Sequence, residues 1–205
     1  MDNFKSAVIL AGGKSSRMEF DKQLLIIKEK RLIYEIAKKL EKHFDEIIII
    51  SNKKEYYNDC KYKVLSDEIK DMGPLAGIAV GLKESTSKFV YIVACDMPNM
   101  DEEYIKYLRK KVEKDIIIKK ESDIYLSKIN GRMELFHGFY KKKLGDEINN
   151  YLLTSSRRSI ISFIERTNKR VSYIEDIEFL KKYFKYNMFV NLNTKKDLEL
   201  YEKEI

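Results

Sequence analysis

The sequence predicts an α/β domain of three layers, with helices on both faces of a mainly parallel sheet. Two observations carry this prediction. Strand-like and helix-like patterns alternate through the first half of the chain, which is the order that a parallel sheet with crossover helices requires. The isoleucine run at residues 47–50 is continuous instead of alternating with polar residues, and this is typical of a strand covered on both faces.

Four short apolar runs in the first half are predicted as strands, at residues 7–10, 47–51, 62–65 and 89–94. A helix is expected between the first two, because apolar residues recur at helical spacing from Leu32 to Phe44. Gly73 and Pro74 open a second helix, since proline suits the first helical turn. Asp101 is expected to cap a third helix.

The second half has a less regular pattern. Strands are predicted at residues 115–118, 124–127, 135–140 and 189–193, and helices at residues 142–151 and 159–166. Thr194 is expected to cap a final helix, with Asp197 as its capping-box partner. No repeat or linker interrupts the sequence, so one continuous domain is expected over residues 1–205.

The charge pattern favours a solvated surface over a nucleic-acid-binding one. The formal net charge is +7, but 33 acidic residues are interleaved with 40 basic ones. A nucleic-acid-binding protein would concentrate its positive charge on one face or in an arm. Here Lys and Glu alternate along predicted helices, as at residues 38–42, and the mild excess helps to attract anionic ligands.

The sequence favours neither a membrane protein nor a secreted one. No stretch approaches the roughly 18 to 20 apolar residues of a membrane span, and residues 1–5 do not begin a signal peptide. Cys60 lies in a polar stretch and Cys95 at the end of an apolar run, so a disulfide is not expected. These observations predict a cytoplasmic protein.

The segment after the first strand is the most informative one for function. The first apolar run leads into a loop with Gly12 and Gly13, followed by Arg17 and Lys22. Glycines let backbone N–H groups approach phosphate oxygens closely, and the two cations supply positive charge. Val8 stands where a Walker loop needs its first glycine, and no third spaced glycine completes a dinucleotide fingerprint. The loop therefore predicts a third kind of nucleotide site.

Asp96 follows a buried strand directly, at the edge where open α/β sheets bind their ligands. A carboxylate there is a suitable ligand for Mg²⁺, which prefers oxygen donors and substrate phosphates. The alternative is structural, because the segment Asp96-Met97-Pro98 also suits a turn.

Other polar positions are candidates for contacts with nucleotide or substrate. Asp67 follows the strand that ends at Leu65, and it either binds a base or ribose or is only solvated. In a strand, Asn191 and Asn193 would point to one face, where their amides could read a heterocycle; strand-end capping is the alternative. Gly77 inside a helix marks close approach by a ligand or another backbone, or simple helix packing.

Residues for other common chemistries are sparse. His43 and His137 do not have the spacing of zinc ligands. We expect His43 to be exposed on its helix and His137 to be packed in a strand, with a substrate contact as the alternative for His137. Cys95 has no histidine partner nearby in the sequence, so a nucleophilic role is not expected.

Four motifs follow one another over nearly the whole chain. They are Leu10-Ala11-Gly12-Gly13 with Ser15, Arg17-Met18 and Asp21-Lys22; Gly73-Pro74-Leu75-Ala76-Gly77; Cys95-Asp96-Met97-Pro98; and Asn191-Leu192-Asn193-Thr194 with Asp197-Leu198. Together they resemble the molybdenum cofactor guanylyltransferases, within the Rossmann-like nucleotidyltransferases. Glu19 departs from the glycine usual in that family, and residues 133–137 lack the proline of its pterin-contacting strand.

The resemblance implies a set of site residues. The GTP site would be lined by Leu10, Ala11, Gly12 and Gly13. Lys22 and Arg17 would act on the phosphates, and Asp67 would help to bind the nucleotide. Asp96 would bind both nucleotide and Mg²⁺. On the pterin side the candidates are Asn191, Asn193 and Arg157.

The resemblance also implies a reaction, the transfer of GMP from GTP to the terminal phosphate of molybdopterin-bound molybdenum with release of pyrophosphate. Lys22, Arg17 and Asp96 would carry the catalysis. Residues 1–112 would bind the nucleotide and residues 113–205 the second substrate. Contacts with an insertase that supplies the cofactor, or with acceptor molybdoenzymes, remain open.

Three other functions fit the same motifs. Two are nucleotidyl transfers on the same scaffold, cytidylyl transfer to molybdopterin and transfer to a sugar phosphate. Asp21 before Lys22 fits the guanylyl type better, since the cytidylyl type more often has proline there. The third is a non-catalytic nucleotide-binding adaptor, for which Glu19 is the one hint.

Overall fold

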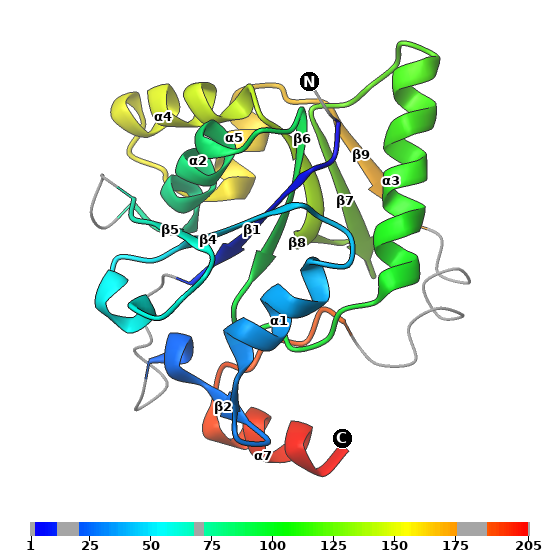
Figure 1. The fold of residues 1–205 in the computed structure, drawn as a ribbon. Helices are drawn as coiled ribbons and strands as arrows, with labels where there is room; N and C mark the ends of the chain where they lie inside the picture. The colour runs from blue at the N-terminus through cyan, green and yellow to red at the C-terminus, as the bar shows by residue number, and fades with distance from the viewer. Residues whose placement is uncertain (1–2, 12–20, 68–71, 176–187, 205) are drawn as a thin grey trace.

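The computed structural model of the chain, whose described residues are 3–11, 21–67, 72–175 and 188–204, has a large sheet with helices on both faces (Figure 1). Its strand order is β5-β4-β1-β6-β8-β7-β9. β8 runs antiparallel to its two neighbours, and the other pairings are parallel. The strands are β1 (Ser6–Leu10), β4 (Glu46–Ile50), β5 (Lys63–Leu65), β6 (Phe89–Ala94), β7 (Ile124–Ile129), β8 (Arg132–Lys141) and β9 (Val171–Ile174). The predicted α/β class is therefore confirmed.

After their first residues, Ser6 in β1 and Glu46 in β4, these central strands are apolar because both of their faces are covered. Val8 of β1 pairs in register with Ile48 of β4 and with Ile92 of β6. Successive side chains of a strand point to opposite faces, so Val8 and Ile9 lie in separate hydrophobic clusters, one on each face. This explains the continuous isoleucine run in the sequence.

Two layers of helices complete these clusters (Figure 1). One face is covered by α1 (Leu32–Leu40) and α3 (Glu102–Ile117), and the other by α2 (Pro74–Glu84), α4 (Leu144–Thr154) and α5 (Ile160–Arg166). A Cβ atom added at Gly77 of α2 would come within 3.2 Å of side-chain atoms of Leu10 and Ile50. Gly77 therefore serves the close packing of α2 on the sheet.

The parallel pairings bring the carboxyl ends of β1, β4, β5 and β6 to one edge of the sheet, called the carboxyl edge below. From β1 the chain goes to β4 and β5 on one side, and then to β6 on the other side of β1. Ligands of open α/β sheets bind where the connections diverge in this way. The opposite edge is called the amino edge.

The strand predicted at residues 115–118 is wrong. These residues belong to the end of α3 and the residue after it. The buried positions Tyr104, Leu108 and Val112 continue at helical spacing toward them, while Ile117 is 79% exposed. The apolar run is thus the end of a helix with exposed side chains and not a buried strand.

The strand predicted at residues 189–193 is also wrong, because these residues pair with no strand. Leu192 is buried and donates its N–H to the backbone oxygen of Asp96, at 2.9 Å. This bond ties the segment to the end of β6.

The predicted helix caps are confirmed. Asp101 Oδ1 accepts the N–H of Tyr104 at 2.9 Å. α7 (Lys195–Glu204) begins with the expected capping box, in which the N–H of Asp197 donates to Thr194 Oγ1 at 3.1 Å and the N–H of Thr194 donates to Asp197 Oδ2 at 2.7 Å. β9 was not predicted, and neither was the separate pair of β2 (Ile26–Ile27) and β3 (Lys30–Arg31).

Candidate functional site

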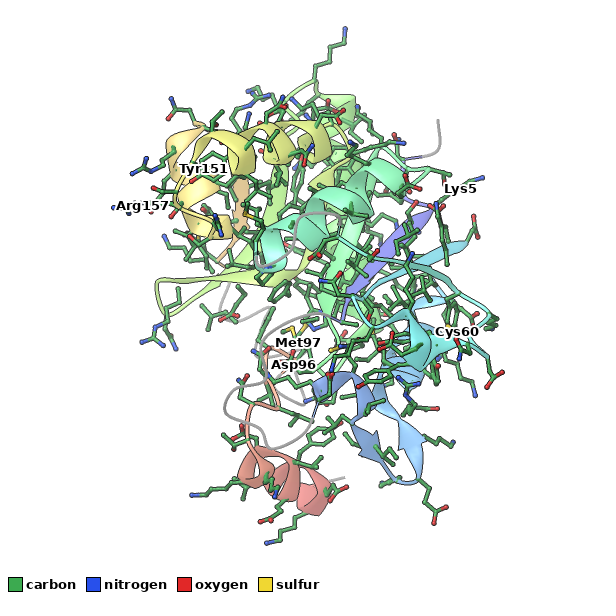
Figure 2. All side chains as sticks on the ribbon, turned by 90° about the vertical axis from the view of Figure 1, so that its left-hand side faces the viewer. Lys5, Cys60, Asp96, Met97, Tyr151 and Arg157 are labelled. Atoms are coloured by element: carbon green, nitrogen blue, oxygen red, sulfur yellow. The ribbon has the colours of Figure 1, made fainter. Side chains whose placement is uncertain are left out.

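Three polar side chains from distant parts of the chain meet at the carboxyl edge. Lys22 Nζ lies 2.7 Å from Asp96 Oδ2 and 2.6 Å from Asn193 Oδ1. Lys22 belongs to the short helix η1 (Lys22–Leu24), Asp96 follows β6, and Asn193 precedes α7. The Lys22 and Asp96 side chains are 22% and 14% exposed, and Figure 2 shows Asp96 beside Met97 beyond the end of the sheet, on the side of α7. A ligand can therefore reach this ion pair.

The end of β1 forms the floor of the same edge. The N–H of Ala11 donates to the Ile50 oxygen at 2.9 Å, and the N–H of Cys95 donates to the Leu10 oxygen at 3.0 Å. The Leu10 and Ala11 side chains are buried. The other predicted residues of this loop, Gly12, Gly13 and Arg17, lie outside the described residues, as does Glu19.

Asp67 lies at the carboxyl edge after β5, beside a residue that the sequence analysis missed. The side chain of Asn52, two positions past β4, accepts the backbone N–H of Asp67 at 3.2 Å. Asp67 Oδ1 is buried and has no hydrogen-bond partner among the described residues. A buried carboxylate oxygen without a partner is costly, so this atom is suited to a donor group on a ligand. The position of Asn52 just after a strand was the available signal.

The two asparagines do not act as a pair on one strand face. Asn193 Oδ1 accepts from Lys22, whereas the Asn191 amide donates to the Phe189 oxygen at 3.2 Å. Arg157 lies in the exposed connection between α4 and α5, where its N–H donates to Ser155 Oγ at 3.1 Å. Figure 2 shows Arg157 well separated from Asp96. The structure thus brings Asn193 to the ion pair, but not Arg157.

Histidine and cysteine chemistry has little access to this site. His137 is fully buried, and its Nδ1 lies 2.9 Å from the Tyr91 hydroxyl. Burial lowers the pKa of His137 to about 3, so the ring is neutral and packed, as its strand position suggested. The expected exposure of His43 is wrong, because its side chain is only 9% exposed. Burial raises the pKa of the Cys95 thiol, and both cysteines are free.

The donor set at the carboxyl edge fits a metal ion that protein and substrate hold together. Within the described part of the chain, no group of three or more His, Cys, Asp or Glu side chains gathers to hold a metal. Asp96 offers carboxylate oxygens beside a cationic side chain that binds anions. Mg²⁺ is commonly held by one or two carboxylates together with substrate phosphates and water. Asp96 therefore fits Mg²⁺ brought with a phosphorylated ligand.

The open α/β sheet, with this ion pair at its strand switch point, places the protein among the α/β folds that bind their ligands at the carboxyl ends of the strands. No helix in residues 3–11, 21–67, 72–175 and 188–204 is long and apolar enough to span a membrane. The family model described as a MobA-like NTP transferase domain matches residues 7–171.

Relatives and solved structures agree with this match. A molybdenum cofactor guanylyltransferase from Syntrophotalea carbinolica is 38% identical over 98% of this chain and 92% of its own length. A probable molybdenum cofactor guanylyltransferase from Peptoclostridium acidaminophilum is 41% identical over 98% of this chain and 89% of its length. Molybdopterin-guanine dinucleotide biosynthesis protein A from Archaeoglobus fulgidus shares the fold, with a TM-score of 0.80, 24% identity and 97% coverage of both chains. The chain belongs to the MobA-like NTP transferase family, among the molybdenum cofactor guanylyltransferases.

Proposed function

We propose that this protein transfers GMP from GTP to the terminal phosphate of molybdopterin-bound molybdenum and releases pyrophosphate. The observation that carries the proposal is the Lys22–Asp96 pair at the carboxyl edge. It unites the phosphate-binding and metal-binding groups that the transfer needs. The names of the full-length relatives support GTP as donor and the molybdenum cofactor as acceptor.

The nucleotide binds along the ends of β1, β4 and β5. Lys22 turns from Asp96 to the phosphates, where Arg17 and the backbone of Gly12 and Gly13 add further donors. Asp67 accepts a hydrogen bond from the base or the ribose through its unpartnered oxygen. Leu10 and Ala11 line the floor of this site.

The chemistry needs positioning and charge neutralisation rather than a general base. An anionic phosphate oxygen of the acceptor attacks the α-phosphorus of GTP, and the bond from that phosphorus to the bridging oxygen breaks with departure of pyrophosphate. Lys22 and Arg17 reduce the repulsion between the two anions and hold them in line. The acceptor oxygen is already deprotonated, which agrees with a neutral and buried His137.

Asp96 is the residue that would hold Mg²⁺. A bound Mg²⁺ would supply charge stabilisation at the α-phosphate and the leaving pyrophosphate. Asp96 Oδ2 is paired with the Lys22 ammonium, so the ammonium and the ion would compete for the Asp96 carboxylate.

The second substrate is assigned to residues 113–205 and the nucleotide to residues 1–112, as two parts of a single domain. The candidates for pterin contacts are Asn193, Asn191 and Arg157. Of these, Asn193 already bonds to Lys22 in the structure. We place the enzyme in the cytoplasm, with GTP and the molybdenum cofactor as ligands. Transient contact with a cofactor-supplying insertase or with acceptor molybdoenzymes would transfer the cofactor directly, without its release into solution.

The test is calorimetric titration of the purified protein with GTP, CTP, ATP and UTP in Mg²⁺, followed by pyrophosphate release on addition of the molybdenum cofactor. The proposal expects a GTP preference that weakens in Lys22→Ala. A preference for CTP would move the function to cytidylyl transfer. Tight GTP binding without pyrophosphate release would indicate a nucleotide-binding adaptor.

A further inference from the structure

We propose that Gln23 is a positioning residue, whose side-chain amide holds Lys22 at a fixed place relative to the end of β4. This role rests on the proposed function of Lys22 as a phosphate contact. Gln23 is 5% exposed, although it follows Lys22 directly and lies at a ligand-binding edge. A buried amide in this place needs partners, and the described residues supply all of them.

The Gln23 amide joins η1 to the end of β4 and to the short helix η2 (Lys54–Tyr57). Its Oε1 accepts from the Ser51 hydroxyl and, at 3.1 Å, from the Tyr57 hydroxyl. Its Nε2 donates to Asp21 Oδ1 at 3.2 Å. The same Asp21 oxygen accepts the backbone N–H of Gln23 at 3.1 Å. The turn from Asp21 to Gln23 is thereby bonded both within itself and to Ser51, the residue that follows β4.

Arg31 holds the backbone of the same turn. Its Nη2 donates to the Gln23 carbonyl at 2.9 Å, and its Nη1 donates to the Tyr56 carbonyl at 2.7 Å. The guanidinium lies 4.7 Å from the centre of the Tyr34 ring and 5.0 Å from that of Tyr57. These stacked contacts favour a single orientation of the planar group.

Ser51, the partner of Gln23 just after β4, is adjacent to the residue that bonds to Asp67. Ser51 bonds to the Gln23 side chain, and its own N–H donates to the Leu65 oxygen at 2.7 Å. Asn52, the next residue, accepts from Asp67. One strand end therefore connects the phosphate side of the site to the side proposed for the base or ribose.

The hydrogen bonds of Gln23 contribute most to the position of Lys22 when a nucleotide binds. In the structure, Lys22 is also restrained by Asp96 and Asn193. A nucleotide phosphate would compete with these partners for the Lys22 ammonium, so binding weakens the restraints on the Lys22 side chain. The contacts of Gln23 do not involve the ligand, and they keep the turn in place. Small misplacements of a phosphate-contacting group reduce rates strongly.

The test is a pair of variants that first breaks and then restores the Gln23–Asp21 hydrogen bond. Gln23→Glu sets two carboxylates against each other, and kcat is expected to fall by about 10- to 100-fold. The KM for GTP should change less, because a long lysine side chain still reaches a ground-state phosphate. Adding Asp21→Asn lets the introduced amide donate to the introduced carboxylate, and most of the lost kcat should return.

The matched control is Ser87→Ala, which breaks a buried hydrogen bond of similar kind at the amino edge. Ser87 Oγ donates to Ser6 Oγ at 2.7 Å, and both residues are fully buried. This variant should lower the unfolding temperature and leave kcat unchanged. An active wild-type enzyme with an unimpaired Gln23→Glu variant, or a double variant that recovers stability but no kcat, would overturn the positioning role alone. A wild-type protein that transfers no GMP would refute the proposed function and this role with it.

Discussion

The two edges of the sheet both hold lysine–carboxylate pairs, but they differ in how completely the protein satisfies them. At the amino edge, Lys141 Nζ lies 3.1 Å from Glu121 Oε1 and 3.7 Å from Asp123 Oδ1. Lys88 lies 2.7 Å from the other Glu121 oxygen, and Lys143 lies 3.0 Å from Asp123. The Lys141 side chain is only 8% exposed. In this network each carboxylate is paired with two lysines of the protein itself.

At the carboxyl edge the charged groups have fewer partners among the described residues. Lys22 is shared between one carboxylate and one neutral amide, and Asp67 Oδ1 has no partner among the described residues. A phosphate can replace Asp96 on Lys22, and a cation can replace Lys22 on Asp96. Under the proposed function, the amino-edge charges stabilise the fold and the carboxyl-edge charges bind ligands, and the variants below test this comparison.

The largest expected effect is that of Asp96→Ala. Pyrophosphate release should fall by about 1,000-fold, since a metal contributes several kcal/mol to the stabilisation of a transition state. The unfolding free energy should change by about 1 kcal/mol or less, because a partly exposed ion pair contributes little. Assays of pyrophosphate at saturating GTP measure the rate of turnover, and urea unfolding measures the unfolding free energy. Near-normal turnover in Mg²⁺ would remove Asp96 from the metal site.

Lys22→Met tests separately the phosphate that would bind Lys22 and the metal ion that would bind Asp96. The Kd for GTP should rise by about 10- to 100-fold, because a charge-assisted contact with phosphate is lost. Binding of Mn²⁺ alone should become tighter, because Asp96 no longer has a competing ammonium. Calorimetry and electron paramagnetic resonance measure these changes. Lys61→Met, which removes the exposed pair with Glu41, is the control and should alter neither; weaker Mn²⁺ binding in Lys22→Met would contradict the exchange.

Lys141→Met tests the structural side of the comparison. Loss of the buried ammonium leaves Glu121 and Asp123 with one lysine each, and a loss of about 2 kcal/mol of unfolding free energy is expected. This is less than the full effect of breaking a buried pair, because the carboxylates are partly exposed. GTP affinity should be unchanged. A large loss of GTP affinity without loss of stability would show that the amino edge also serves ligand binding.

The amino-edge network also predicts an acid-sensitive contribution to stability. The Lys88 hydrogen bond lowers the pKa of Glu121. Burial opposes the same change at Asp123, but hydrogen bonds from Lys143 and from the Arg170 N–H prevail and lower its pKa. Folded pKa values below the unfolded ones mean that the unfolded chain takes up protons first as the pH falls below about 5, so stability is lost on acidification. Urea unfolding between pH 7 and pH 3 should show a shallower decline for Glu121→Gln, and an unchanged slope would contradict this assignment.

The smallest effect is expected for Arg157→Ala. If Arg157 meets the molybdopterin phosphate, the KM for the second substrate should rise about threefold, as expected for one exposed charge. The Kd for GTP should stay the same. Steady-state kinetics with varied cofactor concentration decide this, and an unchanged KM would remove Arg157 from the second-substrate site.

Local patterns were sufficient for most of the fold. The isoleucine run of β4 and the spacing of α1 are both visible in the sequence, because burial on one or two faces imposes a period on the residues. The two wrong strands, at residues 115–118 and 189–193, are short apolar runs, for which period alone does not separate strand, helix end and loop. α3 begins at the Asp101 cap, buries Val112 and continues through residues 115–117. Residues 189–193 form no strand, and the N–H of Leu192 bonds to the Asp96 oxygen instead.

The charged members of the candidate site and the amide of Asn193 were predictable, whereas Asn52 and Gln23 were not. Lys22 and Asp96 stand out because each follows a strand or loop of recognisable type. Asn52 and Gln23 are ordinary polar residues in the sequence, and their importance comes from partners at β5 and at Ser51. His43 was expected to be exposed because its neighbours in sequence are charged, but packing in the tertiary structure covers its ring.

By itself the sequence determined the class of fold, the strand ends that carry the site, and the family to which the motifs point, since these depend on neighbouring residues and their spacing. Only the tertiary structure decided which of the candidates meet. Lys22 and Asn193 are 171 positions apart and share a hydrogen bond, while Arg157 lies elsewhere. Strand order and helix packing bring such residues together, and neither is encoded in local periodicity.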